Sequence, residues 1–143
     1  MSGIEIRAGT LNVSGESVIG STATKFSCEG NDNGPTTVGA AVAAVKHTVG
    51  NDLTVNISGG TFKGVEGFYE NDPNVDKEGT VTVAISGGTF STAIDAAYCA
   101  PGYIPTENED GTYGVKAAYV AAVGETKYET LAEAIAAAKD GET

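Results

Sequence analysis

The hexapeptide ISGGTF occurs at residues 57–62 and again at residues 85–90. The spacing of 28 residues is typical of a repeat protein, in which one structural unit is duplicated and stacked. Before each hexapeptide, apolar and polar residues alternate, as in DLTVN (52–56) and TVTVA (80–84). The alternation predicts a strand, and Gly-Gly predicts a corner after it, because glycine turns where a side chain would block the bend.

A unit of roughly 25–28 residues with short strands cannot bury its apolar face alone, but stacked parallel units can. The opening IEIRAGTLNV (4–13) is interpreted as a degenerate third copy, in which Ile6 takes the place of Ile57 and Leu11 the place of Phe62. We therefore expect ladders of like side chains in the structural core, formed by Ile6, Ile57 and Ile85 and by Leu11, Phe62 and Phe90.

These patterns predict an all-β fold, a fragment of a right-handed parallel β-helix (a solenoid) with a hairpin closure and a short C-terminal α-helix. The closure is expected at about 93–116, with a hairpin at 103–116 that turns at Asp110-Gly111. Solenoid ends need such a cover, because a bare end exposes apolar core and unpaired backbone. An antiparallel β-sandwich stays open as the competing fold.

The last residues predict a strand followed by an amphipathic helix. Thr130 is a plausible N-cap and Glu133 completes a capping box. The residues expected on one apolar face are Leu131, Ala134, Ile135 and Ala138, with Gly141 as the stop. The domain prediction is therefore 1–116 for the repeats with their closure, and 117–143 for a linker or the cap of a following module.

Net charge limits the classes of partner. The chain carries a net charge of −11 and Arg7 is its only arginine, so nucleic acid and anionic membrane surfaces are not expected partners. No apolar run approaches the roughly 18 residues of a membrane span, so no membrane insertion is expected. Since the strand pattern begins at residue 4, without a secretory leader, we expect the chain to be part of a longer protein.

Metal and cofactor sites are not expected. Cys28 and Cys99 show no zinc-site spacing, and a disulfide between them or two free thiols both stay open. The oxygen-rich segments 29–34 and 70–78 lack the EF-hand spacing. His47 is the only histidine and has no triad motif around it.

Catalysis is not expected either, and we predict no catalytic residue. Carboxylates are abundant, but nearly all lie in loop-like surroundings, whereas a catalytic carboxyl should be partly buried so that its pKa is tuned. A lyase would need cationic groups to neutralise a uronate, and the chain has few.

The ISGGTF copies, the segment YCAPGYIPTENEDGTYGVK (98–116) and the tail AYVAAVGETKYETLAEAIAAAKDGET (118–143) together resemble a known class of module. They are similar to parallel β-helix (pectate-lyase-like solenoid) repeat modules of large cell-surface or secreted proteins of Gram-positive gut anaerobes. The resemblance implies an extracellular location and neighbouring modules in a longer parent chain. It also implies adhesin-like binding of a host protein or glycan, including immunoglobulin capture.

The functional prediction is a non-catalytic surface module that presents loops to a host macromolecule, such as a mucosal glycoprotein or immunoglobulin. The alternatives are a passive stalk or spacer and a fragment of a carbohydrate-active β-helix enzyme. A protruding loop is expected at about 70–79, and tyrosine is a good interface anchor. The candidate binding residues are Phe68, Tyr69, Glu70, Asp72 and Asp76.

Overall fold

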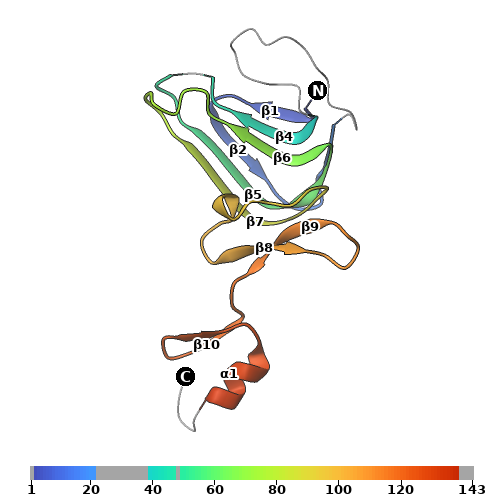
Figure 1. The fold of residues 1–143 in the computed structure, drawn as a ribbon, viewed down its shortest axis with the longest axis vertical. Coiled ribbons are helices and arrows are strands. Elements are labelled where there is room, and N and C mark those ends of the chain that lie inside the picture. The colour runs from blue at the N-terminus through green and yellow to red at the C-terminus, as the bar shows by residue number, and fades with distance from the viewer. Residues whose placement is uncertain (1, 22–38, 48, 139–143) are drawn as a thin grey trace.

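The computed structural model describes residues 2–21, 39–47 and 49–138, which are mostly β with a short C-terminal helix (Figure 1). The strands of the two main sheets are β1 (Ile4–Ile6), β2 (Gly9–Val13), β3 (Val18–Gly20), β4 (Ala40–Val45), β5 (Leu53–Lys63), β6 (Glu66–Asn71), β7 (Val81–Phe90), β8 (Tyr103–Glu107) and β9 (Tyr113–Ala117). The other elements are the 3-10 turn η1 (Ala96–Tyr98), β10 (Ala121–Val123), β11 (Thr126–Tyr128) and α1 (Leu131–Ala137).

The chain passes repeatedly between two sheets. β1, β4 and β6 form a three-stranded parallel sheet, whereas β2, β5 and β7 are parallel neighbours in a six-stranded mixed sheet. β3 also pairs with β5 in parallel, and β9 and β8 extend the mixed sheet as antiparallel strands. The parallel pairing is incompatible with an antiparallel β-sandwich.

Equivalent residues of successive strands lie beside one another in the mixed sheet. Val13 pairs with Ile57 and Ile57 pairs with Ile85, and all three side chains are buried. Phe62 and Phe90 also pair, and their rings stack with centroids 4.6 Å apart and planes at 10°. Because each side chain packs on one of similar shape in the next strand, the apolar core is continuous from β2 to β7.

The N-terminal residues do not join these ladders in the expected register. The observed pairs are Ile6 with Ala44, Leu11 with Val55, Val13 with Ile57 and Ile19 with Phe62. The counterpart of the Gly-Gly corner is SGES (14–17), so the connection from β2 to β3 is one residue longer than in the ISGGTF copies. Ile6 and Leu11 still pack against the core as half-buried side chains.

The two glycines of the corner have different roles. Gly60 and Gly88 have φ of 110° and 104°, a backbone region that favours glycine. At the preceding position, a Cβ on Gly87 would lie 2.5 Å from the main-chain oxygen of Ser58 in the neighbouring strand. The second glycine therefore makes the turn and the first lets the neighbouring corner approach, which explains why both recur.

The C-terminal hairpin covers only one corner of β7. β8 and β9 are antiparallel, and β9 pairs with β7 at Phe90 and Tyr113 alone. At this crossing a Cβ on Gly114 would lie 2.9 Å from the main-chain oxygen of Gly88. The expected closure of the stack is therefore incomplete, since residues 81–84 of β7 lie outside the hairpin's pairing.

α1 packs on the small antiparallel hairpin of β10 and β11. Thr130 Oγ1 accepts a hydrogen bond from Glu133 N at 3.2 Å, and a Glu133 carboxylate oxygen accepts one from Thr130 N at 3.1 Å, which is the predicted capping box. Leu131 and Ile135 are 62% and 66% exposed. Among the described residues, little therefore covers the expected apolar face apart from Ala134, and the predicted stop at Gly141 lies outside them.

The Phe62–Phe90 stack makes a prediction about stability. Each single change to alanine should destabilise the fold by about 3–5 kcal/mol. The double variant should be less destabilised than the sum of the single variants by about 0.5–1.5 kcal/mol, because the second change removes a contact already lost. Urea denaturation of the four proteins measures the coupling. As a control, Phe62→Ala combined with Tyr128→Ala on β11 should be additive, and additivity for both pairs would contradict direct stacking.

Candidate functional site

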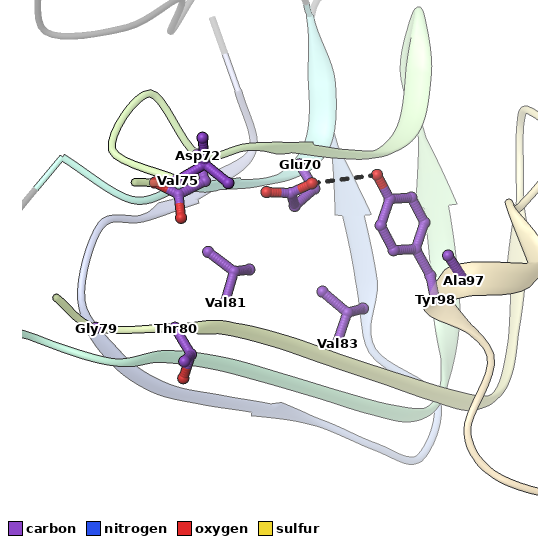
Figure 2. Close-up of a pocket in the computed structure, with 9 residues that line it drawn as sticks. All are labelled: Glu70, Asp72, Val75, Gly79, Thr80, Val81, Val83, Ala97 and Tyr98. Carbon is purple, nitrogen blue, oxygen red and sulfur yellow. Dashed lines mark hydrogen bonds between the residues drawn. The ribbon is translucent and has the colours of Figure 1, made fainter. Parts of the chain in front are cut away.

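A groove of about 630 Å³, here called the end groove, lies between β6 and β7 where the closure stops (Figure 2). Figure 2 shows apolar side chains of β7 on one side, carboxylates on the other, and Tyr98 at one end. The lining residues are Glu70, Asp72, Val75, Gly79, Thr80, Val81, Val83, Ala97 and Tyr98.

β7 forms the floor of the end groove, and no described residue forms a strand beside the edge of its first half. Leu53 N donates a hydrogen bond to Thr80 O, so alternate residues from Thr80 onward turn their main-chain groups toward β5. The N–H and C=O groups of Val81 and Val83 therefore face the other side. Within the described residues, β7 has no pairing on that side before Ile85.

The turn η1 explains why this edge is open. Cys99 forms a single parallel bridge with Ile85, as the first residue of a further strand would. Immediately before Cys99 the chain is wound into η1, whose cap Asp95 accepts a hydrogen bond from Ala97 N at 2.8 Å. Within the part of the chain that the structure describes, this edge of β7 is therefore first paired at Ile85, and Val83 has no partner strand there.

β6 and the residue that follows it supply the acidic wall. Side chains alternate along β6, so Phe68 joins the main core while Tyr69 packs on the opposite face. Tyr98 packs edge-on against Phe68, with ring centroids 5.1 Å apart, and its hydroxyl donates to Glu70 Oε2 at 3.4 Å. Glu70 and Asp72 therefore face the floor across the end groove, as Figure 2 shows.

A buried ion pair anchors the loop that borders the end groove. The side chain of Lys46 has no exposed surface, and its Nζ lies 3.4 Å from a carboxylate oxygen of Asp72. Asp72 also accepts a hydrogen bond from Asn74 N at 2.8 Å, and Asn74 Nδ2 donates to the carbonyl oxygens of Lys46 and His47, each at 3.2 Å. The expected loop after residue 70 is therefore fixed at its base rather than free.

Burial raises the pKa of the Glu70 carboxyl, and the charge of Asp72 raises it further, whereas the hydrogen bond from Tyr98 opposes both. Burial also raises the pKa of the Tyr98 phenol, with the nearby Glu70 charge as the second cause. Asp72 is paired with Lys46, but Glu70 has no ion pair with a cation among the described residues. The end groove thus offers an apolar floor, free main-chain groups and one uncompensated carboxyl.

The structure separates the five candidate binding residues. Glu70 and Asp72 line the end groove. Phe68 is only 7% exposed, so its expected exposure is wrong, because the alternation of β6 turns it into the core. Tyr69 is half-buried on the opposite face, against Ala40, Ala43 and Val45. Asp76 is exposed in the loop and does not line the groove.

Most residues that line the end groove, and Lys46 beside them, are not among the five candidate binding residues. The alternation of TVTVA (80–84) predicts that Val81 and Val83 face the core. They line the groove because the closure leaves this part of β7 uncovered. Tyr98 packs its ring against Phe68 of the core and donates its hydroxyl to Glu70. A signal for Lys46 was available, since a lone lysine directly after the apolar run AAVAAV indicates a buried partner.

Other candidate chemistry lies apart from the end groove or outside the described residues. No group of three or more His, Cys, Asp or Glu side chains in the described ranges is arranged to hold a metal ion. Burial lowers the pKa of His47, as does the charge of Arg7. Cys99 is a half-buried free thiol, while Cys28 and the segment 29–34 lie outside the described residues. No described helix has the length and apolar character to cross a membrane.

Comparison with known proteins gave no match to a protein-family model, to a curated protein or to a solved structure.

The Lys46–Asp72 pair predicts a specific pattern of stability. Asp72→Ala should destabilise the fold by about 2–4 kcal/mol, because it leaves a buried ammonium without its partner. The double variant Lys46→Met with Asp72→Asn should lie within about 1 kcal/mol of the original chain, since no buried charge remains. Chemical denaturation measures both. Equal destabilisation by the two variants would show that the charge pair is not what the loop depends on.

The raised pKa of Glu70 predicts a pH dependence with a defined sign. The folded state holds the Glu70 proton more tightly than the unfolded chain, so this group's stabilisation is present at low pH. It is lost as pH rises from near the ordinary value of 4.5 through the raised folded pKa. Glu70→Gln should therefore gain stability relative to the original chain across this window. A stability difference that is flat with pH, measured by thermal unfolding, would contradict a raised pKa.

Proposed function

We propose that the chain is a non-catalytic module of a right-handed parallel β-helix that binds a host macromolecule from a bacterial surface or as part of a secreted protein. The observation that carries the binding proposal is the end groove, with its unpaired strand edge and its carboxyl wall. The β-helix proposal is supported by the chain's alternation between the parallel sheet of β1, β4 and β6 and the parallel part of the mixed sheet, β2, β5 and β7. Like residues in register, such as Ile57 beside Ile85, support it further.

The end groove favours binding over a passive stalk. A stalk needs uniform coils and covered ends, since an open edge of β-strand is a template for pairing with other chains. Here the closure pairs with β7 at Phe90 and leaves Val81 and Val83 beside an open groove. The net charge of −11 fits a partner with a basic surface and disfavours nucleic acid.

The non-catalytic assignment is supported by the way the two groove carboxylates are used. A hydrolase would need two carboxyl groups at the reacting bond, one as the acid and one as the base or nucleophile. Glu70, with its raised pKa, suits an acid, but Asp72 is held by Lys46 and by the main chain of Asn74. A carbohydrate-active fragment therefore remains the weaker alternative.

We further propose that residues 1–116 and 117–143 are separate units and that the second adjoins a neighbouring module of a longer parent chain. The support is the packing of α1 on β10 and β11, together with the exposure of Leu131 and Ile135. We also propose an extracellular location, and the support is the resemblance of the ISGGTF copies and the segments 98–116 and 118–143 to surface modules.

Affinity capture tests the binding proposal. The immobilised chain is incubated with intestinal mucus glycoproteins and serum proteins, and retained proteins are identified by mass spectrometry. Val83→Glu places a charge on the groove floor and should abolish retention of a specific partner, such as a mucin or immunoglobulin. The matched control is Val18→Glu, because Val18 is 70% exposed on β3 and lies outside the groove.

The outcomes separate the alternatives. A partner retained by the original chain and by Val18→Glu, but lost from Val83→Glu, supports a binding module with its site in the end groove. Retention by all three proteins keeps the binding but moves the site elsewhere. Retention of nothing specific by the original chain overturns the proposal in favour of the stalk. Circular dichroism of each variant checks that the fold is intact.

A further inference from the structure

We infer that the end groove binds an extended peptide segment with a basic side chain, which pairs with the edge of β7 and directs that side chain at Glu70. The inference rests on the proposed binding function and gives the partner its chemistry: a solvent-exposed strand or tail that carries lysine or arginine.

The open edge of β7 selects an extended ligand. The N–H and C=O groups of Val81 and Val83 face the groove side, where the described residues place no strand. An added strand would satisfy these groups with main-chain hydrogen bonds, which is how sheet edges capture peptides. Ile85 is already bridged by Cys99, so the free stretch is short and suits a segment of about four or five residues.

The geometry of a sheet fixes where the ligand's side chains point. Residues in register on neighbouring strands project to the same face. Ligand residues beside Val81 and Val83 would therefore project into the end groove, between the apolar floor and the wall that carries Glu70 (Figure 2). The alternate ligand residues would point to the outer face, so only every second residue is selected.

Charge selects a basic residue at one of these inward positions. Asp72 is compensated by the buried Lys46, whereas Glu70 has Tyr98 as its hydrogen-bond partner and no ion pair among the described residues. A lysine or arginine of the ligand would supply the missing cation, and the raised pKa of Glu70 would fall as the pair forms. A second copy of this chain is a poorer occupant, since its net charge is also −11.

Hydrogen exchange and peptide binding test the inference together. In the free chain, the amides of Val81 and Val83 should exchange much faster than those of Thr82 and Ala84, which face β5. The probes are the fluorescent pentapeptides Thr-Val-Thr-Lys-Thr and Thr-Lys-Thr-Val-Thr, which cover both strand directions. Each has two controls, one with glutamate in place of lysine and one with N-methylated main chain. Fluorescence anisotropy measures binding up to millimolar peptide.

The expected result is that at least one lysine peptide binds and slows exchange at Val81 and Val83, while its glutamate and N-methyl controls do not. Glu70→Gln should weaken binding about 3- to 10-fold, because the charge of the pair is lost. Glu66→Gln, an equal charge change on β6 outside the groove, should leave it unchanged.

Three results would each overturn the inference. They are slow exchange at Val81 and Val83 in the free chain, equal binding of the lysine and glutamate peptides, and no binding by either lysine peptide. The proposed function is tested separately. Capture of a host protein that depends on Val83 but not on a basic segment would keep the module's binding role and reject this ligand. Peptide binding without capture of any host molecule would keep the basic-peptide ligand and reject the proposed host-binding role.

Discussion

The in-register pairing of like residues across β2, β5 and β7 is the constraint on which the rest of the structure depends. Val13, Ile57 and Ile85 pack in one row, and the Phe62 and Phe90 rings stack in another. A slip of one residue would turn every inward side chain outward. The repeated ISGGTF corner protects the register, because Gly87 lets the neighbouring corner approach closely. The sequence repeats, in physical terms, because adjacent strands must present matching surfaces.

The same stacking produces the end groove. Each strand packs its apolar side chains and pairs its main-chain N–H and C=O groups with the next strand. The last strand has no next strand, so these side chains and main-chain groups stay exposed unless another segment covers them. In this chain the hairpin covers the Phe90 end, and η1 delays the return of the chain until Cys99. The exposed remainder of β7 faces Glu70 and Asp72. The buried Lys46 pairs with Asp72, so the charge of Glu70 has no such partner among the described residues. The uncovered part of β7 therefore borders a groove with a defined lining and charge.

Local signals predicted much of the fold. Alternation before each ISGGTF predicted β5 and β7, and the Thr130–Glu133 spacing predicted the helix cap, because such features depend on neighbouring residues alone. The register of β2 was mispredicted, since the connection at 14–17 lacks Gly-Gly and is one residue longer. For the site, Glu70 and Asp72, which line the end groove, were among the candidate binding residues. Phe68 was also a candidate, which requires an exposed side chain, but its side chain is buried in the core. The open edge at Val81 could not be anticipated, because it depends on where η1 leaves the stack.

The most direct test of the account is a nuclear Overhauser measurement on methyl-labelled chain, with Ile57 as the reference residue. The pairing of β2, β5 and β7 predicts contacts from Ile57 to both Val13 and Ile85, one on each neighbouring strand of the mixed sheet. Contacts from Ile57 to Ile6 in place of Val13 would contradict the register. Contacts to neither Val13 nor Ile85 would contradict the parallel stack itself, and with it the open edge from which the end groove is built.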